Sequence, residues 1–193
     1  VRSAIAHIIN YDSMAKIIGN GSTPGAAPFP PSANLGYDAI ANKPMTDVAK
    51  ADQILTQAGY AKNANGMYVK DGKELAITIA IWGKDTSLYE EIQQELKKAG
   101  IAVTLKKLQS PDEVDTLGTD GFDLVERNVV TMSTNDPYWF LSLFYKTGAK
   151  ANVGAYSNPQ VDALIEQLSV TFDQNARANE AKQAQQLLVD DVA

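Results

Sequence analysis

The chain has 193 residues, a formal net charge of −6 and 45% hydrophobic residues, so it can bury a sizeable core as one domain or two very small ones. The absence of cysteine excludes disulfides, thiolate metal sites and cysteine nucleophiles. A single histidine argues against a zinc site or a Ser-His-Asp triad. The basic residues are few and scattered, which argues against a nucleic-acid-binding surface.

The first third of the sequence predicts helices separated by a long loop. Apolar residues at helical spacing predict two short helices within residues 5–18, with Asp12 as the N-cap of the second. Residues 19–44 are rich in glycine and proline and predict a loop of the kind that is functional or wraps a surface. A further helix is expected within residues 46–59, where Gly59 ends it.

The middle of the chain predicts a parallel sheet. Turn signals at Asn65-Gly66 and Asp71-Gly72 precede a strand at residues 75–82, and a helix and a second strand follow at residues 88–99 and 101–105. A strand-helix-strand unit of this length predicts parallel pairing through a right-handed crossover. We therefore expect an α/β fold with a small, mostly parallel sheet flanked by helices.

The last third predicts one more strand followed by helices. A short helix at residues 113–117 leads to a strand at residues 122–125, and Pro137 and Pro159 each stand where the first turn of a helix begins. A last helix is expected around residues 181–188. In parallel sheets ligands bind beyond the carboxyl ends of the strands, which here are followed by residues 82–87 and 126–136.

The segment that ends in Asp136-Pro137-Tyr138-Trp139 has three interpretations: a catalytic loop, a ligand-binding rim, or an ordinary capped helix. Trp139 has Phe140 and Phe144 as helical neighbours, which favours packing, whereas Trp82 ends a strand and enters a polar loop, which leaves packing and ligand contact about equal.

A serine acyl enzyme of the penicillin-recognising type is an alternative from a different class. Residues 13–16 match Ser-x-x-Lys, residues 146–148 match Lys-Thr-Gly, and residues 156–158 resemble Tyr-x-Asn. In that family Tyr-x-Asn precedes Lys-Thr-Gly, which lies on a strand. Here the order is reversed, and Lys-Thr-Gly follows an expected helix, so we attribute the matches to chance.

Three other patterns have plain structural interpretations. Residues 19–25 lack the spacing and the preceding strand of a phosphate-binding loop. The acidic residues Glu90, Glu91 and Glu95 fall on the wet face of an amphipathic helix. His7 stands among apolar residues, where a structural histidine is more common than a ligand.

Taken in order, several segments resemble the family 5 extracellular solute-binding proteins, the receptors of dipeptide, oligopeptide and nickel ABC importers. Val1–Asn10 is similar to that family's "VRQAIAYAID" helix. The other similar segments are residues 28–31, 49–60, 91–101, 136–137 and 156–165. Each is weak alone, and their order along nearly the whole chain is specific.

The resemblance implies a periplasmic-binding-protein type II-like lobe. Residues 1–193 would form a single domain, the lobe distal to the chain termini of a larger two-lobed receptor. It would be a binding protein and not an enzyme, with no cofactor, and would capture a peptide, nickel chelate or other small polar solute between its lobes. Its partners would be the missing first lobe and a membrane permease, in the periplasm or anchored outside the cell as a lipoprotein. A peptide-sensing or pheromone receptor of the same fold is the alternative.

The family's ligand residues carry over unevenly. Peptide receptors of this family place an aspartate where this chain has Ser133, and nickel-chelate receptors place a tryptophan and a tyrosine where it has Thr131 and Asn135. The hydroxyl and amide groups present suit hydrogen bonding to a polar neutral or anionic ligand, with Arg127 as a charge partner. The predicted ligand-binding residues are Trp82, Arg127, Asn128, Thr131, Met132, Ser133, Thr134, Asn135 and Tyr138.

Overall fold

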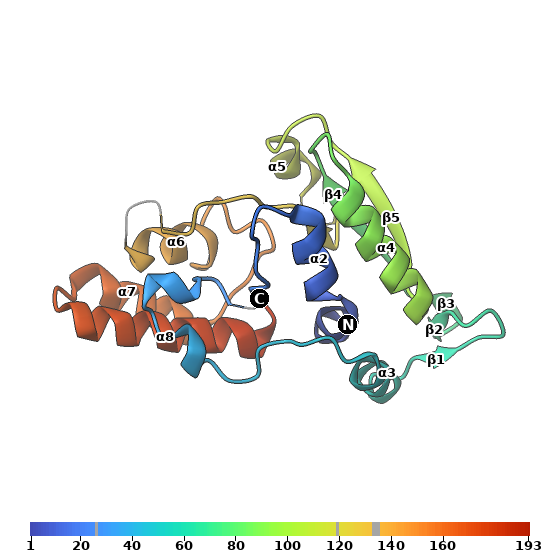
Figure 1. Cartoon of the computed structure of the whole chain (residues 1–193), viewed down its shortest axis with the longest axis horizontal. Helices are drawn as coiled ribbons and strands as arrows, with labels where there is room; N and C mark the ends of the chain where they lie inside the picture. Colours follow the sequence, from blue (N-terminus) through green and yellow to red (C-terminus); the bar gives the residue numbers. More distant parts are fainter. Residues whose placement is uncertain (26, 119, 133–135) are drawn as a thin grey trace. The chain divides into compact units, whose positions relative to one another are not determined.

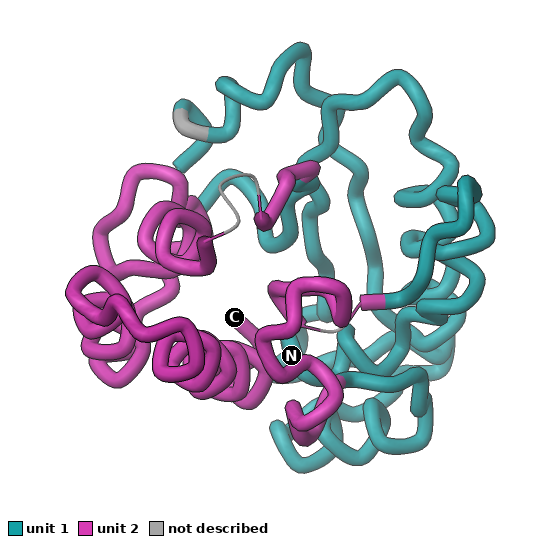
Figure 2. Tube along the Cα trace, turned by 60° about the vertical axis from the view of Figure 1, so that its left-hand side comes forward, with its two compact units in different colours: residues 1–24, 44–127 teal, residues 25–43, 128–193 magenta. Residues whose placement is uncertain are grey.

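The computed structural model describes residues 1–25, 27–118, 120–132 and 136–193. The chain forms two compact units, coloured separately in Figure 2. Unit 1 comprises residues 1–24 and 44–127, and unit 2 comprises residues 25–43 and 128–193. Each unit has a hydrophobic core of its own. That residues 1–193 act together as one lobe of a receptor stays a prediction.

Unit 1 contains the sheets and most of the shorter helices (Figure 1). Its helices are α1 Arg2–Ile8, α2 Tyr11–Ile18, α3 Val48–Gln57, α4 Ser87–Ala99 and α5 Glu113–Leu117. Its strands are β1 Ala61–Lys62, β2 Tyr68–Lys70, β3 Lys73–Glu74, β4 Ala76–Ile81, β5 Ala102–Lys107 and β6 Leu124–Val125.

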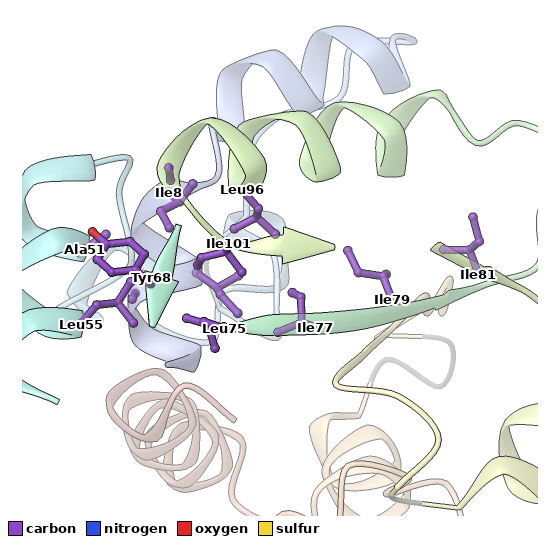
Figure 3. Close-up of a cluster of buried hydrophobic side chains, with 13 residues drawn as sticks. Ile8, Ala51, Leu55, Tyr68, Leu75, Ile77, Ile79, Ile81, Leu96 and Ile101 are labelled. Carbon is purple, nitrogen blue, oxygen red and sulfur yellow. The ribbon is translucent and has the colours of Figure 1, made fainter. Parts of the chain in front are cut away.

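The main sheet of unit 1 has the order β5-β4-β6, and both pairs of strands are parallel. The predicted parallel pairing is therefore confirmed, with α4 as the crossover between β4 and β5. Isoleucines 77, 79 and 81 of β4 are buried together with Leu96 of α4 and Ile101 before β5 (Figure 3). This apolar contact between helix and sheet is the main source of stability for such a unit.

The N-cap of α2 differs from the prediction. Asn10, not Asp12, occupies that position, and its side chain accepts a hydrogen bond from the backbone N–H of Ser13. The backbone N–H of Asn10 donates in turn to Glu95 of α4 at 2.9 Å. Asp12 instead lies in the first turn, where a carboxylate favours the positive end of the helix dipole. Either residue type can cap a helix, so the sequence alone did not decide between the two positions.

The second sheet of unit 1 is a small antiparallel meander, β1-β2-β3, whose centre is Tyr68. This side chain is buried, and its phenol donates a hydrogen bond to the carboxylate of Asp52 in α3. Burial, then the hydrogen bond and charge of Asp52, raise the pKa of Tyr68 above its ordinary value of 10.0. The phenol is therefore held in its protonated form by the fold.

We expect the Tyr68 phenol to contribute stability that is complete below about pH 10 and is lost as the pH rises further, because the unfolded chain ionises first. The stability difference between the wild type and Tyr68→Phe should therefore be constant up to about pH 9 and narrow from about pH 10 to pH 12. Urea unfolding of both proteins over this range measures it. A difference that stays constant across the range would contradict the prediction.

Unit 2 is helical in the residues that the structure describes (Figure 1). Its elements are the 3-10 helices η1 Pro31–Ala33 and η2 Tyr37–Ala39 and the α-helices α6 Pro137–Phe144, α7 Pro159–Val170 and α8 Gln174–Asp191. The prolines at the starts of α6 and α7 confirm the predicted helix boundaries. The core joins Phe29 and Leu35 to apolar residues of all three α-helices.

The segment predicted as a glycine- and proline-rich loop is divided between the units. Its residues 25–43 belong to unit 2 and include both 3-10 helices, which the sequence did not predict. Phe29 is fully buried, and its ring meets that of Phe140 edge to face, with 5.5 Å between the ring centroids. This part of the segment therefore contributes to the core of unit 2.

Within the described part of the chain, none of the helices has the length and apolar character needed to cross a membrane.

Candidate functional site

In unit 1, two parallel strands end side by side and place polar groups at one edge of the sheet. The register pairs Ala80 of β4 with Val125 of β6, so the residues after these strands leave the sheet together. The carboxylate of Glu126 accepts hydrogen bonds from the backbone N–H groups of Trp82, at 2.9 Å, and of Gly83, at 3.4 Å. Glu126 therefore holds the two strand ends in a fixed relation.

A tyrosine from α4 completes this cluster. Tyr89 is half-buried, and burial, followed by the charge and hydrogen bond of Glu126, raises the pKa of its phenol. A protonated phenol and two backbone N–H groups thus donate hydrogen bonds to the Glu126 side chain. The sequence analysis did not name Glu126 or Tyr89. Their role is to hydrogen-bond other protein groups, and no sequence motif marks such a role.

The two predicted site residues of unit 1 differ in exposure. Trp82 is half-buried, and its backbone is tied to Glu126. Arg127 is exposed, and among the described residues its guanidinium makes no hydrogen bond or ion pair. An exposed guanidinium next to an ordered sheet edge is suited to bind a carboxylate or phosphate of a ligand.

In unit 2, a groove of about 680 Å³ brings two of the predicted residues together. Met132 and Tyr138 both line it, with Asp136 and Pro137 between them in the sequence. The other walls come from η1 and from the turn between α7 and α8: Ala33, Asn34, Leu35, Leu168, Ser169, Thr171, Phe172, Gln174, Asn175, Arg177 and Ala178. A volume of this size is within the range of small-molecule sites.

The remaining predicted residues do not line this groove. Asn128 is exposed and Thr131 is half-buried, and neither belongs to its walls. The predicted ligand contacts Ser133, Thr134 and Asn135 lie outside the described residues. Met132 and Tyr138 therefore line the same groove in unit 2, whereas Trp82 and Arg127 belong to unit 1.

The groove also contains an ion pair that the sequence analysis missed. Arg177 of α8 donates to both carboxylate oxygens of Asp136, at 2.5 and 2.7 Å. Asp136 is at the same time the N-cap of α6, since its carboxylate accepts from the backbone N–H of Tyr138 at 2.8 Å. Forty-one residues separate the two partners, and no short-range pattern links residues at that distance.

Trp139 shows the packing contacts that its neighbours predicted. Its ring meets Phe144 edge to face, with 6.3 Å between the centroids, and Phe140 lies between Phe29, Phe144 and Tyr145 in the core. The tryptophan is still about one third exposed. It therefore packs along one face of α6 and leaves part of its ring in contact with solvent.

The catalytic and metal alternatives find no support in the geometry. Lys146 follows α6, not a strand, and its ammonium pairs with Glu166 at 2.6 Å. His7 bonds the backbone carbonyl of Met45 through its ring at 2.8 Å, as a structural histidine does. Among the residues that the structure describes, no three acidic or histidine side chains are grouped to hold a metal ion.

Three relatives illustrate the similarity of this chain to known proteins. The probable D,D-dipeptide-binding periplasmic protein DdpA of Escherichia coli K12 is 29% identical over 200 residues, covering 100% of this chain and 36% of the relative. The structure of NikA from Staphylococcus aureus in complex with Ni(L-His)2 is 26% identical with a TM-score of 0.79, covering 100% of this chain and 40% of that one.

The third is the oligopeptide-binding protein from Thermus thermophilus complexed with a pentapeptide, with a TM-score of 0.84 at 21% identity over 99% of this chain and 36% of that one. At this identity the likeness shows the fold alone, and it confirms the predicted α/β fold of the periplasmic-binding-protein type. The chain spans about two fifths or less of the length of these relatives.

Residues 1–152 match the family of bacterial extracellular solute-binding proteins, family 5, in its middle region. These residues include α1, the main sheet and α6, and so both places at which the predicted ligand-binding residues are found. The chain belongs to the family 5 bacterial extracellular solute-binding proteins.

Proposed function

We propose that the protein to which this chain belongs is the solute-binding component of an ABC importer, and that the chain supplies one lobe of its ligand cleft. The observation that carries the proposal is Arg127, whose exposed guanidinium follows the carboxyl end of β6 at the edge of the parallel sheet. In an α/β sheet this is the edge at which ligands bind. Family membership makes solute binding the function to test first.

The ligand we propose is a small polar solute that carries at least one anionic group. Arg127 would bind its carboxylate through charge-assisted hydrogen bonds. Relatives with printed ligands bind a D,D-dipeptide, a nickel–histidine complex and a pentapeptide. All three ligands have polar and carboxylate groups, so the proposal covers peptides and metal chelates.

Binding would be coupled to transport by closure of the two lobes of the whole receptor. A ligand that contacts both lobes stabilises the closed state, and a membrane permease would distinguish the closed from the open state. This scheme places the receptor outside the cytoplasm, in the periplasm or tethered at the cell surface. A single lobe should bind weakly, because it supplies part of the contacts and no closure.

Native mass spectrometry of the full-length receptor as purified tests this proposal. A spread of added masses that fit short peptides would identify a peptide receptor, and one discrete mass with a nickel isotope pattern would identify a chelate receptor. Calorimetric titration with D-alanyl-D-alanine, with Ni(II) plus L-histidine, and with penta-alanine provides the matching affinities. A receptor that carries no added mass and binds none of the three probes would contradict the proposal.

Replacing Arg127 with glutamine should weaken the binding of a carboxylate ligand about tenfold, because one charge-assisted hydrogen bond is lost. Titration of the full-length receptor with D-alanyl-D-alanine measures this for a peptide receptor. Lys150→Gln is the matched control, since it removes one exposed positive charge outside residues 127–132. Equal loss in both variants would point to long-range charge, and no loss in Arg127→Gln would exclude its role.

A further inference from the structure

Arg177 connects the ends of three helices in unit 2. Besides both oxygens of Asp136, its guanidinium donates to the backbone carbonyl of Thr171 at 2.6 Å and to that of Leu168. These carbonyls belong to the C-terminal end of α7 and the turn after it, and Asp136 caps the N-terminus of α6. The side chains of Arg177 and Asp136 are 18% and 41% exposed, so these bonds are partly shielded from water.

Each of these hydrogen bonds satisfies a polar group at the end of a helix. The last carbonyls of α7 have no partner within their own helix, and the helix dipole makes that end negative. The Asp136 carboxylate stabilises the N-terminus of α6, but it needs a counter-charge where water is partly excluded. A planar guanidinium can serve both at once, and a lysine cannot, because its ammonium lacks the fork of fixed donors.

The ion pair between Arg177 and Asp136 lies in the same groove as two predicted ligand-binding residues. Asp136 stands between Met132 and Tyr138, the two predicted ligand-binding residues that share the groove, and Arg177 lines the same groove. The peptide group after Asp136 leads directly into Pro137, whose backbone conformation is restricted. Fixing the Asp136 side chain therefore fixes the direction in which α6 presents Tyr138.

We propose that Arg177 is a positioning residue for ligand binding: it holds Asp136, the N-cap of α6, and thereby fixes the place of Tyr138 in the groove wall. This inference rests on the proposed function, since it assigns Arg177 a role in binding the same solute. A purely structural role for the ion pair would affect unfolding of the protein and leave the affinity of the folded receptor unchanged.

The test compares variants of the full-length receptor by calorimetric titration with D-alanyl-D-alanine, with Ni(II) plus L-histidine, and with penta-alanine. Arg177→Gln should weaken the binding of the probe that the wild type accepts about tenfold, and Arg177→Lys should restore part of the loss. Asp136→Asn is the second variant, because asparagine is as good an N-cap as aspartate and preserves α6 while removing the charge. Its effect on affinity should equal that of Arg177→Gln, and the double variant should be no worse than either.

Hydrogen exchange of the ligand-free receptor gives a readout that does not depend on the choice of probe. The amides of Tyr138, which donates to the Asp136 carboxylate, and of Leu141 in α6 should exchange about tenfold faster in Arg177→Gln and in Asp136→Asn. Lys146→Gln is the matched control, since it breaks an exposed ion pair, with Glu166 of α7, that lies outside the groove. This variant should leave both the affinity and the exchange of the Tyr138 and Leu141 amides unchanged.

The outcomes separate this inference from the proposed function. Unchanged affinity in Arg177→Gln and Asp136→Asn would overturn the positioning role while leaving solute binding intact. If the wild type binds none of the three probes, the proposed function fails, and the exchange of the Tyr138 and Leu141 amides alone decides the positioning role. Exchange that is unchanged in both variants overturns it, and faster exchange that Lys146→Gln does not reproduce supports it.

Discussion

Replacing Gln185 with methionine is expected to destabilise the chain by about 2–4 kcal/mol, because two buried backbone groups lose their partners. Gln185 of α8 is fully buried. Its side-chain oxygen accepts from the backbone N–H of Phe29 at 3.1 Å, and its amide donates to the backbone carbonyl of Leu35 at 2.9 Å. This one side chain therefore satisfies the backbone of the segment that crosses the core of unit 2.

Methionine is the appropriate replacement, since it is close to glutamine in length and helix propensity and lacks the amide. The loss of stability then measures the cost of leaving the Phe29 N–H and the Leu35 carbonyl without hydrogen-bond partners, and not the cost of a cavity. Urea denaturation of the 193-residue chain, followed by circular dichroism, measures the change in the free energy of unfolding.

The next residue of α8 supplies a matched control. Gln186 makes the same pair of bonds, accepting from the N–H of Ala41 at 2.7 Å and donating to its carbonyl at 3.1 Å, but it is partly exposed. Water can replace those bonds, so Gln186→Met should cost less than about 1 kcal/mol. Equal losses in the two variants would show that burial is not the cause and would contradict the prediction.

The predictable part of the fold is local. Alternating apolar residues in β4, the glycine that ends α4 and the prolines that begin α6 and α7 each determine their own element within a few residues. Because a strand, a helix and a second strand follow in order, the parallel pairing of β4 and β5 also followed from chain connectivity. Together with the ordered series of family segments, these signals were sufficient for the family, which consists of solute-binding proteins and not enzymes.

The unpredicted part depends on pairs of residues that are distant in the sequence. Gln185 with Phe29, Arg177 with Asp136, and Glu126 with Trp82 are separated by 156, 41 and 44 residues. A glutamine or an arginine in a long amphipathic helix has the same local pattern whether it faces water or a buried partner. The loop character of residues 25–43 was therefore evident, whereas their attachment to α8 was not.

In the candidate site, too, local features could be predicted from the sequence and contacts between distant residues could not. Residue types alone indicated which segment could bind a polar ligand, since Arg127, Asn128 and Thr131 follow a strand end. They did not indicate that Glu126 accepts a hydrogen bond from the backbone of Trp82. They also did not indicate that Asp136 forms an ion pair with Arg177 of α8. The supporting residues are charged side chains with internal partners, and a sequence read alone assigns such residues to the surface.

Replacing Gly100 with alanine is expected to be the most damaging single-methyl addition in unit 1, with a loss of about 3 kcal/mol or more from backbone strain and overpacking together. Gly100 ends α4 with φ +105°, a conformation that residues with a side chain rarely adopt. A Cβ there would meet the backbone carbonyl oxygen of Gly66 at 2.4 Å and the ring of Tyr68 at 3.3 Å.

The clash cannot be relieved by moving a side chain, because the nearest atom belongs to the backbone of another segment. The carbonyl of Gly100 also accepts the N–H of Tyr68 at 2.8 Å, so any shift of Gly100 disturbs the contact between α4 and the meander. Gly72→Ala separates backbone strain from the steric clash, since Gly72 has φ +75° with no atom within 4 Å of an added Cβ.

Gly72→Ala should therefore cost about 1–2 kcal/mol, the backbone term alone. Urea denaturation of the two variants beside the wild type measures the difference, which is the cost of the clash with Gly66. If Gly100→Ala lost no more than Gly72→Ala, the close approach of α4 to the β1-β2 turn would not be a constraint on the fold. A larger loss in Gly100→Ala would mean that position 100 must be glycine for two reasons: its left-handed conformation and its close approach to the backbone of Gly66.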